Sequence, residues 1–473
     1  MRVILAITAS AALYYVSTGL GTVWPLAWVA PVPVLLLAFR PRLRVVAPAA
    51  FAAYLLGSLN LFAYLATVAP PAIVAGNLLA IAGVFTLAVM AARLTYFRLP
   101  GWAAALGFPA AWTTYEFLLS VASPHGTALN VAYSQTDLLP LLQIASVTGV
   151  FGITFLVTLV PSALAVAWTR RDGRVLIAPV VLLAACCGFG AARLAVRAES
   201  VVRVGLAATD HGIGSAFATE DPAKAVAVAR EYAVRVERLA AMGAQVVVLP
   251  EKFVGVTAAD AAAVEGVLRS AARAAGVTLI AGLNRVAPRP PHNAALVIAP
   301  DGEVAAEYEK HHMLPGPETG YVIGTVPGLF RGPGAQWGVA ICKDMDFPSW
   351  SRRYGQAGVR ILAVPAWDFV RDARLHSRMA VVRAVEEGFT MARAAQQGLL
   401  TLSDAYGRIL GEASSGTEPE ALLVQDISAG PGGTFYGRHG DWFGWACVAG
   451  LVAILVASLR RRVNLKKRTD VAA

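Results

Sequence analysis

Long apolar segments constrain this chain more than any other feature of its sequence. Stretches of about 20 apolar residues recur before residue 200, and each can cross a hydrocarbon core of about 30 Å as a helix. We expect seven transmembrane helices there and an eighth near the C-terminus. Their ranges are 3–19, 23–39, 46–66, 71–92, 101–122, 145–168, 175–195 and 442–459. The mean hydropathy of +0.58 also favours a membrane protein over a soluble one.

The basic residues provide an independent test of these helices, because Lys and Arg gather on the cytoplasmic side of a membrane. Loops expected inside contain arginine, and loops expected outside contain neither Lys nor Arg. The inside loops lie at 40–44, 93–98 and 170–174, and the outside loops at 20–22, 67–70 and 123–138. This alternation predicts that both termini are cytoplasmic and that residues 200–440 are extracytoplasmic.

The first apolar run has a second interpretation, which is a cleaved signal peptide that begins with Arg2. Cleavage would reverse the alternation that the later loops support, and no small-residue cleavage site is obvious. We therefore expect a retained helix. The basic residues of 460–468 then form a cytoplasmic anchor.

The net charge of +10 raises the question of a nucleic-acid partner. The basic residues stand in short clusters beside apolar runs and form no long stripe, so we expect no nucleic-acid partner. His311 and His312 are adjacent, and no polar stretch has Cys-x-x-Cys spacing. We expect no metal and no cofactor.

Of the four cysteines, only Cys342 lies in polar sequence; the other three lie in long apolar stretches, where they behave as small hydrophobic residues. A lone thiol in an exported domain forms no internal disulfide. Cys342 is therefore either an incidental buried thiol or a reactive one.

Between about 201 and 430, short β-branched runs alternate with alanine-rich stretches of helical spacing. This pattern predicts an α/β domain. The expected strands are Val201–Ala207, Gln245–Leu249, Val277–Ala281, Ala294–Ile298, Glu303–Glu307, Gly338–Ile341 and Ile361–Val364, and the expected helices are 221–242, 258–275 and 375–388.

Three of these strands end in an ionisable group: Glu251, Lys310 and Cys342. Each alone is more often a solvated or packed side chain. Together they suit acyl transfer, because a thiol with a pKa of about 8.5 needs a base and a positive neighbour to act as a nucleophile. Glu251 can accept the proton, and Lys310 can stabilise the thiolate and the oxyanion. The backbone N–H of Lys343 is the expected second oxyanion donor.

Several motifs in both halves of the chain resemble the nitrilase superfamily and, more specifically, its membrane-embedded branch, the apolipoprotein N-acyltransferases. In the polar domain they are Leu249-Pro250-Glu251, Tyr308-x-Lys310-x-His312-x-Leu314-Pro315 with Glu318, Ile341-Cys342 with Phe347-Pro348, Ala366-Trp367, His376-x-x-Met379-Ala380 and Arg383 to Gly388. In the membrane half they are Trp24-Pro25-Leu26, Trp112-x-x-x-Glu116 and Tyr133-Ser134-Gln135.

The resemblance implies an extracytoplasmic αββα sandwich attached to the membrane bundle. It divides the chain into a seven-helix domain at 1–198, a nitrilase-like catalytic domain at 199–435, and a final helix with a basic tail at 436–473. The implied location is the bacterial cytoplasmic (inner) membrane.

The resemblance also implies a reaction in two steps. Cys342 takes a fatty acyl chain from a membrane phospholipid as a thioester and passes it to the N-terminal amine of a diacylglyceryl-cysteine lipoprotein. Glu251, Lys310 and Cys342 would be catalytic, and Glu318 would support Lys310 or the base. The chain departs from the family pattern at Pro315-Gly316-Pro317-Glu318, at Lys343, and in the short interval from Lys310 to Cys342.

Two alternatives stay open at this point. In the first, the protein is a membrane-tethered amidase or other carbon–nitrogen hydrolase, and water takes the acyl group. In the second, the helices form a transporter or receptor and the outer domain only binds a ligand; this predicts interrupted helices in matching halves, which we do not find. Glu116, in the middle of an apolar helix, is either functional or a hydrogen-bonded structural residue.

Overall fold

The structure, a computed structural model, describes residues 1–40, 43–196, 202–209, 222–287 and 289–471. Val201 and Asp221, at which a predicted strand and a predicted helix begin, lie outside these ranges. The chain forms two compact units. One comprises Met1–Leu194 with His439–Ala473, and the other Ala195–Arg438.

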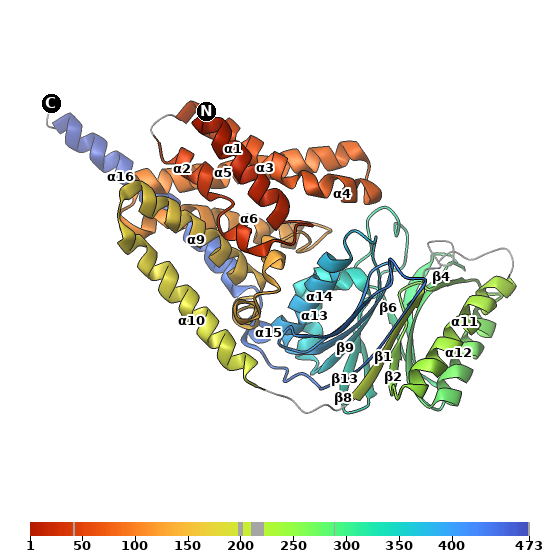
Figure 1. The fold of residues 1–473 in the computed structure, drawn as a ribbon. Coiled ribbons are helices and arrows are strands. Elements are labelled where there is room, and N and C mark those ends of the chain that lie inside the picture. Colours follow the sequence, from red (N-terminus) through yellow and green to blue (C-terminus); the bar gives the residue numbers. More distant parts are fainter. Residues whose placement is uncertain (41–42, 197–201, 210–221, 288, 472–473) are drawn as a thin grey trace. The chain divides into compact units, whose positions relative to one another are not determined.

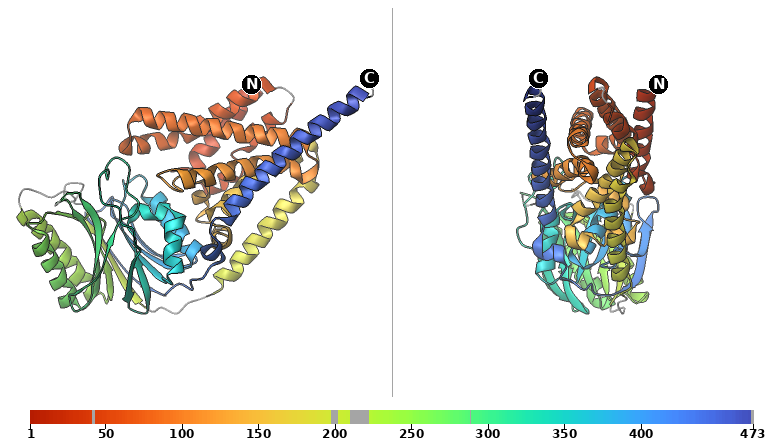
Figure 2. Two further views of the ribbon diagram at one scale, coloured as in Figure 1. Left: turned by 180° about the vertical axis from the view of Figure 1, so that it is seen from behind. Right: turned by 90° about the vertical axis from the view of Figure 1, so that its left-hand side faces the viewer.

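The first unit is helical, and every predicted transmembrane segment coincides with helical structure (Figures 1 and 2). Its α-helices are α1 (Arg2–Ser17), α2 (Val32–Ala38), α3 (Val46–Gly57), α4 (Phe62–Val68), α5 (Pro71–Arg98), α6 (Gly107–Ala122), α7 (Leu139–Leu142), α8 (Ala145–Thr148), α9 (Val150–Arg170), α10 (Ile177–Leu194) and α16 (Trp442–Val471). Its 3-10 helices are η1 (Trp24–Trp28), η2 (Leu43–Val45), η3 (Ser58–Leu61), η4 (Gly101–Leu106), η5 (Val131–Gln135) and η6 (Gly173–Leu176).

Within the described residues, 5 helices are long and apolar enough to cross a membrane. They are Val46–Val68, Pro71–Arg98, Val150–Arg170, Gly173–Leu194 and Trp442–Arg460. The other predicted spans are shorter or divided. Helix α1 has 16 residues, or about 24 Å at 1.5 Å per residue. The second span is a 3-10 helix followed by α2, with Pro31 at the N-cap of α2. A count of eight spans therefore stays a prediction.

Glu116 is buried in the helical unit, where both oxygens of its carboxylate accept hydrogen bonds. Oε1 accepts hydrogen bonds from Trp112 Nε1 (3.1 Å) and from the backbone N–H of Val131 (2.9 Å), and Oε2 accepts one from Thr154 Oγ1 (2.7 Å). The carboxylate thus joins α6 to η5 and α9. This favours the structural interpretation of Glu116, because burial is tolerated when the polar group is hydrogen-bonded.

The second unit has four layers, helix, sheet, sheet and helix, as predicted (Figure 1). The first sheet has the strand order β13-β1-β2-β4-β5-β6, with β3 paired to β4, and the second has the order β12-β11-β10-β9-β8-β7. The strands are β1 (Val202–Thr209), β2 (Val246–Val248), β3 (Val254–Val256), β4 (Thr278–Arg285), β5 (His292–Ile298), β6 (Val304–Glu309), β7 (Gly328–Gly332), β8 (Ala335–Val339), β9 (Ile361–Trp367), β10 (Thr390–Gln396), β11 (Leu399–Ser403), β12 (Ile409–Ser414) and β13 (Glu420–Ile427).

Helices α11 (Pro222–Ala241) and α12 (Ala261–Ala275) cover the first sheet, and α13 (Pro348–Gln356) and α14 (Ala373–Glu387) cover the second (Figure 1). The short helices η8 (Cys342–Asp346) and α15 (Phe435–His439) complete the unit. The position of strand β2 explains why its sequence is apolar throughout. Val246 and Val248 face the core between the sheets, whereas Val247 packs under α11 and α12, so both faces are buried.

Candidate active site

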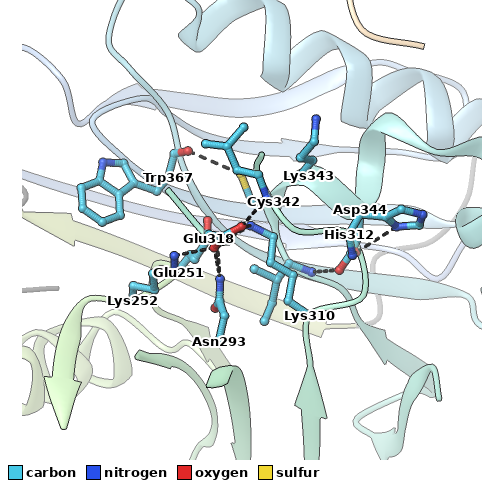
Figure 3. Close-up of polar contacts among 12 residues, drawn as sticks. Glu251, Lys252, Asn293, Lys310, His312, Glu318, Cys342, Lys343, Asp344 and Trp367 are labelled. Carbon is cyan, nitrogen blue, oxygen red and sulfur yellow. Dashed lines mark hydrogen bonds and ion pairs between the residues drawn. The ribbon is translucent and has the colours of Figure 1, made fainter. Parts of the chain in front are cut away.

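Glu251, Lys310 and Cys342 each follow a strand of this sandwich, and the strands belong to both sheets. Glu251 comes three residues after β2, and Lys310 directly follows β6, both in the first sheet. Cys342 begins η8, just after β8 of the second sheet. Figure 3 shows their side chains gathered where the strands end. The three residues are distant in sequence and come together because the two sheets pack against each other with these strand ends side by side.

The ammonium group of Lys310 joins two buried carboxylates. Its Nζ lies 2.8 Å from Oε1 of Glu251 and 2.8 Å from Oε2 of Glu318, and all three side chains are at most 3% exposed. Burial alone would lower the pKa of Lys310, but Glu251 and Glu318 outweigh burial and raise it well above its usual value. Lys310 is therefore a fixed positive charge.

Glu318 is held from several sides. Its Oε2 also accepts a hydrogen bond from the backbone N–H of Leu314 (2.7 Å). Its Oε1 accepts a hydrogen bond from Nδ2 of Asn293 (2.7 Å) and forms an ion pair with Lys252. Burial opposes its ionisation, but Lys310 and then Lys252 overcome this and lower the pKa of Glu318 to about 2. The carboxylate is ionised at neutral pH.

Asn293 connects the two carboxylates. Its Nδ2 donates to Oε1 of Glu251 (2.6 Å) as well as to Glu318. The residue lies on β5, and its backbone carbonyl accepts the N–H of Lys310 (2.9 Å). One side chain thus fixes the separation of the two acids, and its backbone anchors the lysine between them.

Cys342 is partly buried and packs against the core between the two sheets. Its Sγ donates to the backbone carbonyl of Trp367 (3.4 Å), at the end of β9. Its φ of +43° is rarely adopted by residues other than glycine, and such strain concentrates at functional sites. Burial raises the pKa of the thiol well above its usual value, and Glu251 adds to this, whereas Lys310 opposes it. The resting group is a thiol that needs a base.

Asp344 secures the turn that carries Cys342. Its carboxylate accepts the backbone N–H groups of Ile341 (2.9 Å) and His312 (2.8 Å) and the hydroxyl of Tyr308 (2.7 Å). These bonds connect the nucleophile segment to the segment of Lys310. The same carboxylate therefore sets the relative positions of two candidate catalytic residues.

A buried ion pair lies behind the thiol. Arg393 on β10 donates through Nη1 to Oδ2 of Asp368 (2.9 Å), and both side chains are at most 2% exposed. Asp368 follows Trp367, whose backbone carbonyl accepts a hydrogen bond from the thiol. The pair thus supports the backbone beside the nucleophile.

The structure brings the predicted Glu251, Lys310, Cys342 and Glu318 into one cluster. It places Lys343 in η8, where its side chain is buried and Nζ donates to Asp346 Oδ2 (2.9 Å). The oxyanion role of its backbone N–H stays a prediction. Sequence reasoning missed Lys252, because its contact with Glu318 depends on the backbone conformation that follows Glu251.

Sequence reasoning also missed Asn293 and Arg393, because a polar residue within a buried strand has no distinguishing pattern. No group of three or more His, Cys, Asp or Glu side chains that could hold a metal ion occurs in the described part of the chain.

Two family models match this chain. Residues 204–430 match Carbon-nitrogen hydrolase, and residues 10–163 match the Apolipoprotein N-acyltransferase N-terminal domain. The chain belongs to the apolipoprotein N-acyltransferase family. The catalytic unit of this N-acyltransferase family member thus lies within the nitrilase superfamily, and the sequence resemblance is confirmed.

Several curated relatives of this family member are named apolipoprotein N-acyltransferase. The apolipoprotein N-acyltransferase of Geobacter metallireducens is 27% identical over 392 residues, which cover 76% of this chain and 74% of the relative. That of Bradyrhizobium diazoefficiens is 28% identical and covers 70% and 68%. Among solved structures, an amidase from Nesterenkonia sp. AN1 is 24% identical, with a TM-score of 0.43, and covers 50% of this chain and 96% of the amidase.

Proposed function

We propose that this protein is an apolipoprotein N-acyltransferase, which transfers a fatty acyl chain from a membrane phospholipid through a Cys342 thioester to the N-terminal amine of a diacylglyceryl-cysteine lipoprotein. One observation carries this proposal. The N-terminal apolar helices match the domain particular to this family, and the same chain continues into a nitrilase-like unit. A soluble amidase would require only the second part.

In the first step, Sγ of Cys342 attacks the ester carbonyl carbon of the phospholipid while its proton passes to Glu251. Lys310 and the backbone N–H of Lys343 stabilise the oxyanion. The carbon–oxygen ester bond breaks, the leaving alkoxide takes the proton from Glu251, and a lysophospholipid departs. Cys342 then holds the acyl chain as a thioester. The raised pKa of the resting thiol supports this role for a neighbouring base.

In the second step, the neutral α-amine of the lipoprotein attacks the thioester carbonyl. The carbon–sulfur bond breaks as an amide forms, and the amine proton passes through Glu251 to the sulfur. Glu318 holds Lys310 in place during both steps. The contacts of Lys310 with both acids support this division of roles.

Membrane attachment suits this chemistry, because both substrates are anchored in lipid. We assign seven spans to residues 1–198, the catalytic domain to 199–435, and an eighth span with a cytoplasmic tail to 436–473. The arginine-bearing and arginine-free loops favour a catalytic domain on the extracytoplasmic side of the bacterial cytoplasmic (inner) membrane. Binding of the acyl chains would help to position the ester at the thiol.

Product analysis tests transfer against hydrolysis. The purified protein in mixed micelles receives a phospholipid with a labelled acyl chain and a diacylglyceryl lipopeptide with a free N-terminal amine. The matched control is the same lipopeptide with an acetylated amine. We expect labelled N-acyl lipopeptide and lysophospholipid in equal amounts with the free amine only. Free fatty acid released at equal rates with both peptides would instead identify a hydrolase.

A further inference from the structure

Lys252 directly follows Glu251 and turns its side chain back toward the candidate site. Its φ of +49° lies in the left-handed region, which is costly for a residue with a side chain. Its ammonium group forms an ion pair with Oε1 of Glu318, and only 11% of its side chain is exposed. Figure 3 shows Lys252 beside the two acids. The strained backbone and the buried charge point to a specific role.

The ring of Tyr321 holds the same ammonium group from another side. Nζ of Lys252 lies 4.8 Å from the ring centroid, and the Tyr321 hydroxyl donates to Oδ1 of Asn284 (3.0 Å). A cation over an aromatic face is stabilised by the ring quadrupole. Lys252 is therefore fixed in place, rather than a mobile surface lysine that happens to lie near an acid.

The charges of the cluster balance only when Lys252 is counted. Glu251 and Glu318 supply two negative charges, and Lys310 and Lys252 supply two positive ones. Each carboxylate oxygen of Glu318 forms an ion pair with a different lysine. Oε1 pairs with Lys252, and Oε2 pairs with Lys310. Without Lys252, Lys310 alone would face two carboxylates.

We propose that Lys252 is a positioning residue of the acyl-transfer site, which binds Glu318 so that Lys310 retains enough positive field to stabilise the Cys342 thiolate and the oxyanion. This inference rests on the function proposed above for Cys342. Lys252 acts through Glu318 and Lys310 and makes no contact with the reacting atoms.

The direction of its effect on the thiol follows from the surrounding charges. The charged groups around Cys342 are Glu251 after β2, Lys310 after β6, and the ion pair of Asp368, which follows β9, with Arg393 of β10. Removing Lys252 leaves the charge of Glu318 opposed by Lys310 alone, which weakens the influence of Lys310 on the sulfur. We expect the pH midpoint of Cys342 alkylation to rise by about one unit, and alkylation below that midpoint to slow about tenfold.

The experiment measures iodoacetamide labelling of Cys342 against pH in the full-length protein, read by mass spectrometry on the peptide that contains Cys342. Lys252→Met should raise the midpoint, and Lys252→Arg, which keeps the charge, should not. Lys224→Met is the matched control, because Lys224 is exposed on α11. The double variant Lys252→Met/Glu318→Gln restores the charge balance and should return the midpoint close to that of the wild type.

Two results would overturn the inference. One is a midpoint in Lys252→Met equal to that of Lys224→Met. The other is an equal upward shift in the single and double variants, which would indicate a purely structural role for Lys252. If Lys252→Met does not fold, a shifted midpoint in Lys252→Arg counts against the inference in the same way. Labelling requires neither phospholipid nor lipopeptide, so a failure of the proposed transfer reaction would be distinguishable.

Discussion

Gly282 allows β4 to pass close beneath the candidate base, and its replacement by alanine should displace Glu251. A Cβ at residue 282 would lie 2.3 Å from the carbonyl oxygen of Pro250 and 2.7 Å from Cα of Glu251. Both contacts are with backbone, so no side-chain rotation relieves them. The segment would have to move by about 1 Å to reach ordinary van der Waals separation. A misplacement of this size in a catalytic group can reduce the rate by about 100-fold.

The assay is the rate at which acyl-Cys342 appears after mixing with phospholipid. Gly282→Ala should slow this rate by about 100-fold and leave the protein folded. The matched control is Gly266→Ala on α12, where an added Cβ meets nothing within 4 Å. In a helix this change should preserve or increase stability. An acylation rate in Gly282→Ala equal to that of Gly266→Ala would refute the argument that the position of Glu251 limits the reaction.

Two further predictions concern stability. Arg393→Met leaves Asp368 buried without its partner and should lower the free energy of unfolding by about 3–5 kcal/mol, seen as a lower thermal midpoint. The control Arg203→Met removes an exposed ion pair and should leave that midpoint unchanged. Equal effects of the two variants would contradict the prediction. Burial lowers the pKa of His376, but Asp372 outweighs it and raises the pKa to about 9, above the ordinary 6.5. Its stabilising charge is present below 6.5 and lost as pH rises through about 9, so the thermal midpoint should fall over this interval, and His376→Gln should remove that fall.

Part of the candidate site could be predicted from the sequence, because its ionisable residues come soon after predicted strands. Glu251, Lys310 and Cys342 each follow a predicted strand, and this placement predicted that they would meet. Glu318 came from the family resemblance alone. Lys252 was not predictable from pattern, because its contribution depends on a left-handed backbone and on a loop that returns from residue 321.

The fold was predictable to a similar extent. The predicted helices and strands of the second unit are confirmed, with ends that differ by a few residues. The prediction omitted six strands, β3, β7, β10, β11, β12 and β13. Strand β10 was omitted because Arg393 interrupts its apolar run, and the ion pair with Asp368 on the neighbouring segment makes that arginine compatible with burial. Strand β13 was omitted because it is half-exposed and pairs with β1, which lies more than 200 residues earlier in the chain. Both cases depend on partners that are distant in sequence.

The most direct test of the account is the intact mass of the protein after incubation with a phospholipid donor and no acceptor. We predict a mass increase of one acyl chain, located on the peptide that contains Cys342, removed by neutral hydroxylamine and absent from Cys342→Ala. A wild-type protein that is folded and supplied with donor but carries no acyl group on Cys342, or carries it equally in Cys342→Ala, would contradict the central claim.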